Sequence, residues 1–272
     1  MELYNLADIK TILEKHGLWA KKQFGQNFLI NKDILMTIVE TAKLKPTEQV
    51  IEIGPGLGVL TNELAKLVTR VTCLELDTTL LPVLKETLSA YKNVQILNQD
   101  ALHFSPCFKE YKVVANIPYN ITSPLINLFL QADLKPESMT ILVQREVAEK
   151  ICIIDPDMTV LSLQVALFGK AKLVKKVGAG CFYPAPKVES AILHIDIYKP
   201  GDENYVETKK ALEALNLAKK AFSQRRKMLS NTLADYKEIM AKVGIASNRR
   251  PETLSVKEWL SLTDGIKSKN KL

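Results

Sequence analysis

The chain is poor in the residues that build metal centres and disulfide frameworks. Its 272 residues include four cysteines and three histidines, and both sets are widely scattered. Neither set has the spacing of metal ligands, so reduced, mostly structural thiols are expected and no metal is predicted. No apolar run approaches the roughly eighteen residues of a membrane span, and the N-terminus lacks a signal-peptide core. These absences favour a cytoplasmic protein without a membrane partner, which we expect to be a monomer.

Charge is plentiful, at 25% of residues, but the two signs are unevenly distributed. Lys and Arg number 21 against 21 Asp and Glu up to Tyr198, and 16 against 9 from Lys199 onward. A basic C-terminal part favours a partner that carries many phosphates, because bound Lys and Arg release condensed counterions. A solvated basic face without a partner is the alternative.

Glycine is infrequent, eleven in all, yet Gly54, Gly56 and Gly58 stand at every second position. They separate residues 50–53, which predict a buried strand, from a segment with helical spacing. Without Cβ atoms the backbone can take positive φ, and a ligand can lie against it with helix N–H groups at its anionic end. This pattern predicts a nucleotide-like ligand. The alternative is a turn that only packs the helix on the strand.

The spacing of these glycines distinguishes between two cofactors. A dinucleotide-binding fingerprint places its third glycine three residues after the second, where this chain has Val59. The observed spacing therefore favours S-adenosylmethionine (SAM) over NAD. A nicotinamide-dependent dehydrogenase is the least favoured function for this reason.

Further strands are predicted at residues 71–76, 94–97, 112–115, 139–144 and 190–197. The first three end, with residues 50–53, at one rim of a parallel sheet, where ligands bind in α/β folds. Glu75 follows Gly54 by about twenty residues, the separation at which an acid can take both ribose hydroxyls. Asp100 can accept from the amine on an adenine edge. The alternatives are a surface acid for Glu75 and a cap of the next turn for Asp100.

Asn116-Ile117-Pro118-Tyr119 follows the strand predicted at 112–115 and is the most specific chemical signal in the chain. An exocyclic amine on a base is a poor nucleophile because its lone pair is delocalised into the ring. Asn116 Oδ1 and the Ile117 carbonyl can each accept one N–H and aim that lone pair at a methyl donor. Pro118 stiffens the turn and Tyr119 offers a ring for stacking. Such a site works by positioning, because the donor is already activated; away from a strand end it would be ordinary turn chemistry.

Two other segments have aromatic residues outside predicted helices and strands. Residues 21–30 begin with two lysines and either cap a pocket or only link their neighbours. Residues 179–188 form a loop stiffened by two prolines, in which Phe182 could close the second face of an extruded base against Tyr119. The alternative is that the aromatic residues of this loop fill core.

Residues 199–202 predict a boundary between a catalytic domain at 1–198, which includes an N-terminal cap segment, and a small helical domain at 199–272. Within the second domain, five cations in nine residues are the candidate RNA-binding group: Lys219, Lys220, Arg225, Arg226 and Lys227.

Several helix ends are marked by capping residues. Asn31 predicts the start of one helix, and Thr122-Ser123-Pro124 is expected to start another with a hydroxyl cap. Residues 255–258 form a capping box, flanked by Leu254 and Trp259 as a hydrophobic staple. Residues 265–272 are expected to fray.

Taken together, the chain resembles the KsgA-type (RsmA) ribosomal RNA adenine dimethyltransferases over almost its whole length. The resemblance rests on residues 24–29, 52–58, 75–77, 100–101, 116–119, 182–188 and 221–227. It implies a Rossmann-like SAM-dependent methyltransferase fold. It also implies transfer of two methyl groups to the N6 amine of each of two adjacent adenosines, in a hairpin loop near the 3′ end of small-subunit (16S) rRNA. The implied substrate is a partly assembled small ribosomal subunit, whose maturation the enzyme helps to check. By position, the resemblance assigns cofactor contacts to Asn27, Leu29, Gly54, Glu75, Asp100 and Asn116.

The chain departs from the family pattern at Thr159-Val160, where relatives usually have Tyr-Gly, after an acidic stretch at 155–157. This leaves open how that loop meets the substrate. One alternative is the related antibiotic-resistance type, which methylates large-subunit rRNA, but its tail generally lacks a close match to residues 244–255. The other is a non-catalytic assembly or transcription factor on the same fold, against which the intact residues 116–119 argue.

Overall fold

The structure, a computed structural model, describes residues 3–21, 25–153, 157–224 and 226–269. The chain forms two compact units: unit 1 is Met1–Ala148 with Lys172–Ile197, and unit 2 is Glu149–Ala171 with Tyr198–Leu272. The boundary predicted after residue 198 lies one residue from the last passage between the units. Residues 149–171, which were predicted in the first domain, group with the second.

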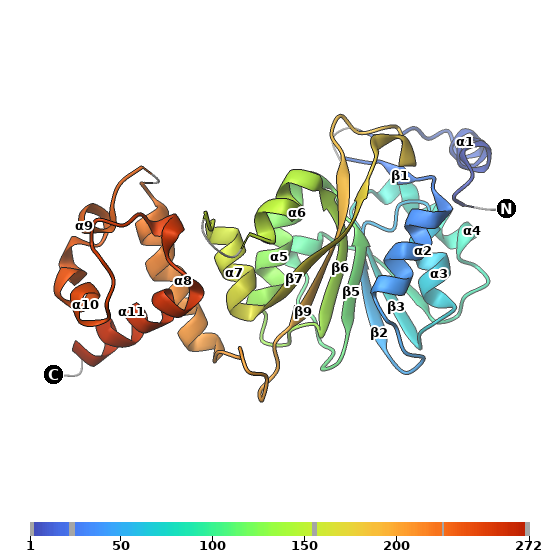
Figure 1. The fold of residues 1–272 in the computed structure, drawn as a ribbon. Coiled ribbons are helices and arrows are strands. Elements are labelled where there is room, and N and C mark those ends of the chain that lie inside the picture. The colour runs from blue at the N-terminus through green and yellow to red at the C-terminus, as the bar shows by residue number, and fades with distance from the viewer. Residues whose placement is uncertain (1–2, 22–24, 154–156, 225, 270–272) are drawn as a thin grey trace. The chain divides into compact units, whose positions relative to one another are not determined.

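A seven-stranded sheet, in the order β4-β3-β2-β5-β6-β9-β7, is the framework of unit 1 (Figure 1). The strands are β2 (Gln49–Ile53), β3 (Arg70–Glu75), β4 (Val94–Asn98), β5 (Lys112–Asn116), β6 (Ser138–Gln144), β7 (Gly169–Val177) and β9 (Ser190–Ile197). The strands from β4 to β6 in this order run parallel, and β9 pairs antiparallel with β6. The α/β fold is therefore confirmed, and each predicted strand is present.

β7 is a strand that the sequence analysis missed. Lys175 and Lys176 are adjacent, so the strand lacks the strict alternation of apolar and polar residues that predicts a strand. Its place at the edge of the sheet accounts for this composition, because exposed lysines occur along it from Lys170 to Lys176.

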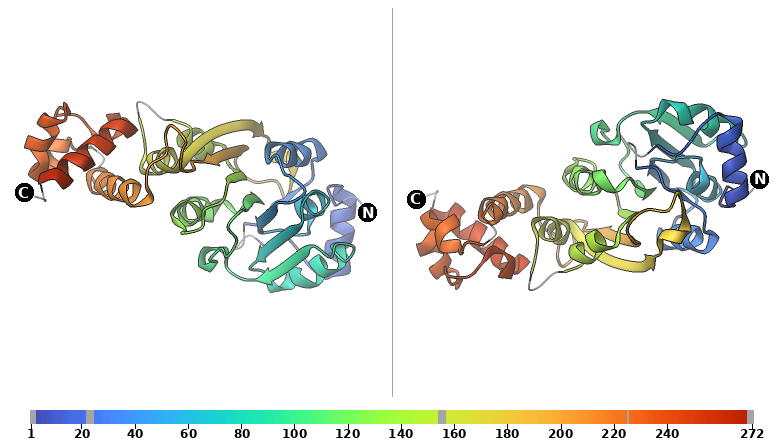
Figure 2. Two further views of the ribbon diagram at one scale, coloured as in Figure 1. Left: turned by 90° about the horizontal axis from the view of Figure 1, so that it is seen from below. Right: turned by 90° about the horizontal axis from the view of Figure 1, so that it is seen from above.

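Helices lie on both sides of the sheet (Figure 2). They are α1 (Leu6–Lys15), α2 (Lys32–Thr41), α3 (Val59–Ala65), α4 (Leu81–Thr87), α5 (Thr122–Gln131) and α6 (Arg145–Ile151). Asn31 caps α2 as predicted, because its side chain accepts from the Ile34 N–H at 3.0 Å. The hydroxyl cap predicted for α5 is wrong: Ile121 occupies the N-cap position, and Thr122 lies inside the helix with its hydroxyl buried.

A second sheet of two short strands joins distant parts of the chain. β1 (Phe28–Leu29) pairs antiparallel with β8 (Phe182–Tyr183), and the Ile30 N–H donates to the Cys181 carbonyl at 2.8 Å. Phe28, Leu29 and Phe182 are all buried in the hydrophobic core. The segment after residue 24 is therefore fixed against the proline-rich loop rather than being a loose linker.

Unit 2 is helical. Its helices are α7 (Val160–Phe168), α8 (Thr208–Phe222), α9 (Leu229–Thr232), α10 (Lys237–Lys242) and α11 (Val256–Lys269). The capping box before α11 is confirmed, since the Ser255 N–H donates to Glu258 at 2.8 Å and the Glu258 N–H to the Ser255 hydroxyl at 3.3 Å. Leu254 and Trp259, the predicted staple, are both fully buried.

The expected fraying is wrong for residues 265–269, because α11 continues to Lys269, and residues 270–272 lie outside the described residues. Gly265 allows close packing at this end: a Cβ there would lie 2.6 Å from the Ile239 side chain of α10. An ion pair between Lys267 and Glu213 of α8 also holds the last turns. Among the described helices of both units, none has the length and apolar character required to cross a bilayer.

Candidate active site

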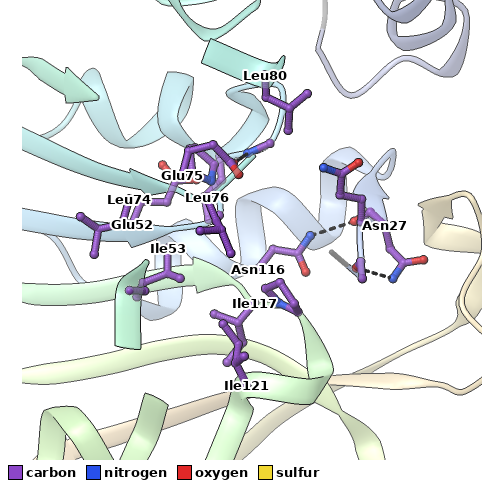
Figure 3. Close-up of a pocket in the computed structure, with 18 of the residues that line it drawn as sticks. Asn27, Glu52, Ile53, Leu74, Glu75, Leu76, Leu80, Asn116, Ile117 and Ile121 are labelled. Carbon is purple, nitrogen blue, oxygen red and sulfur yellow. Dashed lines mark hydrogen bonds between the residues drawn. The ribbon is translucent and has the colours of Figure 1, made fainter. Parts of the chain in front are cut away.

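A cavity of about 190 Å³ opens at the carboxyl ends of β2, β3, β4 and β5 (Figure 3). The strand order reverses here, because β2 lies between β3 on one side and β5 on the other. Ligands of open α/β sheets bind at such a switch point. The cofactor candidates all line the cavity: Asn27, Leu29, Gly54, Glu75, Asp100 and Asn116. Ile117, Pro118 and Tyr119 line it as well.

The glycine turn needs its glycines for both conformation and space. Gly54, Gly56 and Gly58 have φ of +65°, +62° and +86°, in the left-handed region. A Cβ on Gly56 would lie 3.3 Å from the Phe28 ring, and one on Gly54 would lie 3.7 Å from Pro118 Cδ. We call residues 21–30 the cap segment. The glycine turn is therefore packed between Phe28 of the cap segment and the Asn116–Tyr119 turn, and its backbone without Cβ atoms forms part of the cavity wall.

Glu75 presents a carboxylate at the end of β3. It accepts from the Asp77 N–H at 2.8 Å and from the Gly56 N–H at 3.3 Å. Burial raises the pKa of Glu75, and these two hydrogen bonds oppose that effect. Beside it the apolar Leu76 side chain is 52% exposed and lines the cavity. An acid next to an exposed apolar surface suits a nucleoside, which has ribose hydroxyls and a flat base.

Asp100 has the turn-capping role that was weighed as an alternative, and it also lines the cavity. It accepts from the Leu102 N–H at 2.9 Å, and its other oxygen lies 3.3 Å from His103 Nδ1. Each carboxylate oxygen has two lone pairs, so this capping leaves capacity to accept from a ligand amine.

The Asn116 amide is held in one orientation. Its Nδ2 donates to the backbone carbonyl of Asn27 at 3.1 Å, and the Asn27 side chain in turn donates to the Gly25 carbonyl at 3.0 Å (Figure 3). Because a carbonyl accepts only from the N–H side of an amide, the opposite atom, Oδ1, is the acceptor left for a ligand. The cap segment thus orients a side chain that lies 89 residues later in the chain.

Tyr119 is held from β9. Its hydroxyl lies 2.6 Å from the hydroxyl of Ser190, which is fully buried. Burial raises the pKa of the Tyr119 phenol, and the Ser190 hydrogen bond opposes that rise. The ring is therefore fixed at the cavity wall by a contact that the sequence analysis missed.

Phe182 does not lie where the sequence analysis expected it. Its side chain is 3% exposed, belongs to the hydrophobic core, and is not among the residues that line the cavity. The pairing of β8 with β1 turns this ring into the core, so the structure corresponds to the alternative in which it fills core. A sandwich of Phe182 with Tyr119 is not formed in this structure.

A polar network missed by the sequence analysis fastens the cap segment. Asp77 is 3% exposed and accepts from Lys21 Nζ and from Gln26 Nε2, both at 2.9 Å. Burial alone would raise the pKa of Asp77, but hydrogen bonds from Thr79, Lys21 and Gln26 outweigh it and lower the pKa. We call these three residues, Lys21, Gln26 and Asp77, the latch. Motif residues at 26 and 77 were recognised, but nothing in the sequence pairs residues 51 positions apart.

Glu52 is a second functional candidate that was missed. It is 2% exposed, lines the cavity, and accepts from Cys73, whose Sγ lies 3.8 Å from Oε2. Burial raises the pKa of Glu52 to about 8, against the lowering effect of hydrogen bonds from Thr61 and Cys73. The available signal was an acidic residue inside an otherwise apolar strand next to the glycine turn.

The RNA-binding candidates belong to unit 2. Lys219 and Lys220 are exposed in the last turn of α8, and Arg226 and Lys227 are exposed just after it. Lys220 lies 3.7 Å from Asp235, so part of its charge is neutralised. Arg225, like Asp155 and Pro156 of the acidic stretch, lies outside the described residues.

The departure at Thr159-Val160 marks the start of α7. Thr159 and Ser162 form a reciprocal capping box there. No cluster of three or more His, Cys, Asp or Glu is placed to hold a metal ion in the part of the chain that the structure describes.

Comparison with known proteins places the chain in a family. Residues 17–268 match the family model for ribosomal RNA adenine dimethylase. The chain is 42% identical to ribosomal RNA small subunit methyltransferase A of Dehalococcoides mccartyi, over 94% of this chain and 92% of that protein. It is 36% identical to a protein of the same name from Alkaliphilus oremlandii, over 96% of each.

Two solved structures have a similar fold. A dimethyladenosine transferase from Plasmodium falciparum is 25% identical, with a TM-score of 0.73 over 89% of this chain and 98% of that one. The 23S rRNA methyltransferase ErmE is 28% identical, with a TM-score of 0.73 over 89% of this chain and all of that one. The equal scores do not separate the two kinds of enzyme. The family model and the similar sequences both span most of the chain, so it belongs to the ribosomal RNA adenine dimethylase family.

Proposed function

We propose that the protein dimethylates the N6 amines of two adjacent adenosines in the 3′-terminal hairpin loop of 16S rRNA, late in assembly of the small subunit. The observation that carries this proposal is the oriented Asn116 amide, whose Oδ1 is left to accept at the cavity. The names of the relatives support the small subunit as the target. The enzyme would act as a monomer in the cytoplasm, where it meets assembling subunits.

The cavity fits SAM as the methyl donor. Glu75 would take the ribose hydroxyls, Asp100 the adenine amine, and the backbone at Gly54 the methionine end. Asn27 and Leu29 would close the wall that the cap segment provides. When bound, SAM supplies an activated methyl group, and the proposal needs no metal.

The protein's own contribution is to position the acceptor. Asn116 Oδ1 and the Ile117 carbonyl each accept one N–H of the adenine amine, which directs the nitrogen lone pair away from the ring. The Tyr119 ring stacks on the base, with its hydroxyl held by Ser190. The methylated ammonium loses its proton readily to water, so no strong base is required. Most of the rate gain would come from this alignment.

The test of the proposed function is to incubate the protein with SAM and unmodified small subunits, and to map dimethyladenosine by mass spectrometry of rRNA fragments. We expect product in the 3′-terminal hairpin of the small-subunit rRNA. Product on large-subunit rRNA alone would instead support the antibiotic-resistance type. Absence of product on either RNA, with SAM bound, would support a non-catalytic factor.

Asn116→Ala is expected to abolish this product while leaving SAM affinity, measured by calorimetry, largely intact. The reason is that the amide acts mainly as the amine is reshaped. Asn216→Ala, which changes an exposed asparagine of α8, is the matched control and should keep full activity. Turnover of Asn116→Ala at the wild-type rate would reject the assignment.

A further inference from the structure

A lysine-rich stretch around β7 has no role in the function described above. Residues 158–188 contain five lysines and no Asp or Glu. Four of these lysines lie on β7 and are exposed: Lys170, Lys172, Lys175 and Lys176. The equal counts of acidic and basic residues up to Tyr198 conceal this segregation, since the acids lie elsewhere in the sequence.

The lysines lie along an edge of the sheet. β7 is the last strand in the order, next to β9 (Figure 1). Lys172 and Lys176 share one face of the strand and are about 13 Å apart at ~3.3 Å per residue, whereas Lys175 lies on the other face. The lysines are therefore spread along the strand, as phosphates are along an extended polyanion.

The charge of Lys172 and Lys175 is not cancelled by neighbouring acids. β9 carries one acid, Asp196, which lies 3.1 Å from His194, and Glu189 before β9 pairs with Arg145. Within the described ranges, no carboxylate lies within ion-pair distance of Lys172 or Lys175. Both side chains therefore present net positive charge to solvent.

The strand is also continuous with the cavity wall. β7 ends at Val177, and after a short turn at Ala179–Cys181 the chain enters β8, which pairs with β1. The β1 residues Phe28 and Leu29 line the cavity. An RNA whose target base enters this cavity is thus brought to the same unit that carries Lys172, Lys175 and Lys176.

We propose that Lys172, Lys175 and Lys176 form a lysine edge that binds phosphates of the rRNA backbone outside the target hairpin loop. This inference rests on the proposed function, because it takes rRNA as the occupant. Lys and Arg bind phosphates by releasing counterions, without reading sequence. The lysine edge is a second basic surface, formed by unit 1 and distinct from residues 219–227 of unit 2.

Lysines on edge strands have another known use, which is to prevent pairing of one sheet edge with another. That role concerns the protein alone. Removal of the charge would then cause self-association and leave RNA binding unchanged. RNA binding predicts the opposite pair of results, so the two roles can be separated by one set of variants.

The test compares Lys172→Gln/Lys175→Gln/Lys176→Gln with the wild-type protein. Binding to unmodified small subunits is measured by filter binding over a range of salt concentrations. We expect weaker binding at low salt, and a log-log salt dependence shallower by about 0.7 to 0.9 for each phosphate that the variant no longer neutralises. SAM affinity by calorimetry should not change. The variant with arginine at the same three positions should restore the slope.

The matched control is Lys85→Gln/Lys92→Gln/Lys109→Gln, which removes the same charge from three exposed lysines of α4 and the loops on either side of β4. Equal slopes for the two triple variants would overturn the inference. Self-association of the lysine-edge variant with unchanged subunit binding would assign the lysines to edge protection. If the wild-type protein binds subunits but forms no dimethyladenosine, the proposed function fails while the lysine edge is still tested by the slopes.

Discussion

At the scale of single residues, the site is made of groups that are held in place by other groups. The Asn27 carbonyl orients Asn116, and Ser190 holds the Tyr119 hydroxyl. Asn116 and Tyr119 could be predicted from the sequence, because their types and their place after a strand carry chemistry. Ser190 could not be predicted, because a serine in a strand has no signal until the fold brings it to its partner.

The Tyr119–Ser190 hydrogen bond gives a prediction about catalysis. Tyr119→Phe and Ser190→Ala each remove it, and each should lower kcat/KM for small subunits by about fivefold, the equivalent of a net hydrogen bond of ~1 kcal/mol. The double variant should be no worse than either single variant, because all three lack the same bond. SAM affinity serves as the control and should not change. Additive losses in the double variant would contradict the coupling.

Glu52 gives a prediction about stability and pH. The carboxyl has a reference pKa of 4.5, whereas burial raises its pKa in the folded protein to about 8. Between these values the folded protein keeps a proton that the unfolded chain releases, so the free energy of unfolding falls as the pH rises. This stabilisation is fully present below pH 4.5 and is lost by about pH 8. Between these pH values the free energy of unfolding falls by no more than about 1.4 kcal/mol per pH unit.

Glu52→Gln keeps the shape of the side chain but cannot ionise. Urea unfolding across this pH window should therefore show a flatter pH dependence for the variant than for the wild-type protein. Glu63→Gln, which changes a glutamate at the surface ion pair with Lys66, should keep the wild-type dependence. Parallel profiles for Glu52→Gln and wild type would show that Glu52 is ionised throughout.

At the scale of secondary structure, the sequence predicted elements that have an internal pattern. The strands β2, β3, β4 and β5 follow from short apolar runs, and the glycine turn follows from its spacing. β7 was missed because adjacent lysines at an exposed edge break the alternation. Two-residue strands such as β1 and β8 have no pattern of their own, because they exist only as a pair.

The latch gives a prediction at this scale, since it holds the cap segment against the turn after β3. Asp77→Asn removes the ion pair with Lys21 and weakens the acceptor for Gln26. Charged hydrogen bonds of this kind contribute ~1.5 to 3 kcal/mol each. SAM affinity, measured by calorimetry, should therefore fall by about tenfold or more, because Asn27 and Leu29 lose their support.

The control for the latch is again Glu63→Gln, which makes the same charge change at an exposed ion pair and should alter SAM affinity by less than about twofold. A loss equal to that of the control would show that the cap segment is held by the β1–β8 pairing alone. Recovery of SAM affinity by the Asp77→Asn variant at high salt would contradict the latch, since salt weakens ion pairs and cannot replace the one that the variant lacks.

At the scale of the whole molecule, the sequence predicted two parts from a change in charge balance. The structure has two units, but the second takes residues 149–171 from the middle of the chain. Composition could not show that residues 149–171 belong to the second unit, because an apolar helix such as α7 is compatible with either unit. α7 packs against α8, which begins 40 residues after α7 ends.

The basic run at the end of α8 gives the prediction for unit 2. Replacement of Arg225, Arg226 and Lys227 with Ala should weaken binding to small subunits and flatten its salt dependence, by up to about 0.9 in log-log slope for each phosphate left without its cation. The Lys85, Lys92 and Lys109 variant is the control for loss of charge. SAM affinity should be unchanged. An unaltered slope would return this run to a solvated face without a partner.

The passage of the chain between the units has a consequence for how the protein could be shortened or recombined. A fragment that stops at Tyr198 keeps α7 but loses α8 and α11, both of which pack against α7. Such a fragment would expose the apolar surface of α7 and aggregate. The helical unit therefore cannot be exchanged by gene fusion at a single point in the chain. A change of RNA target by exchange of this unit would require residues 149–171 to move with it.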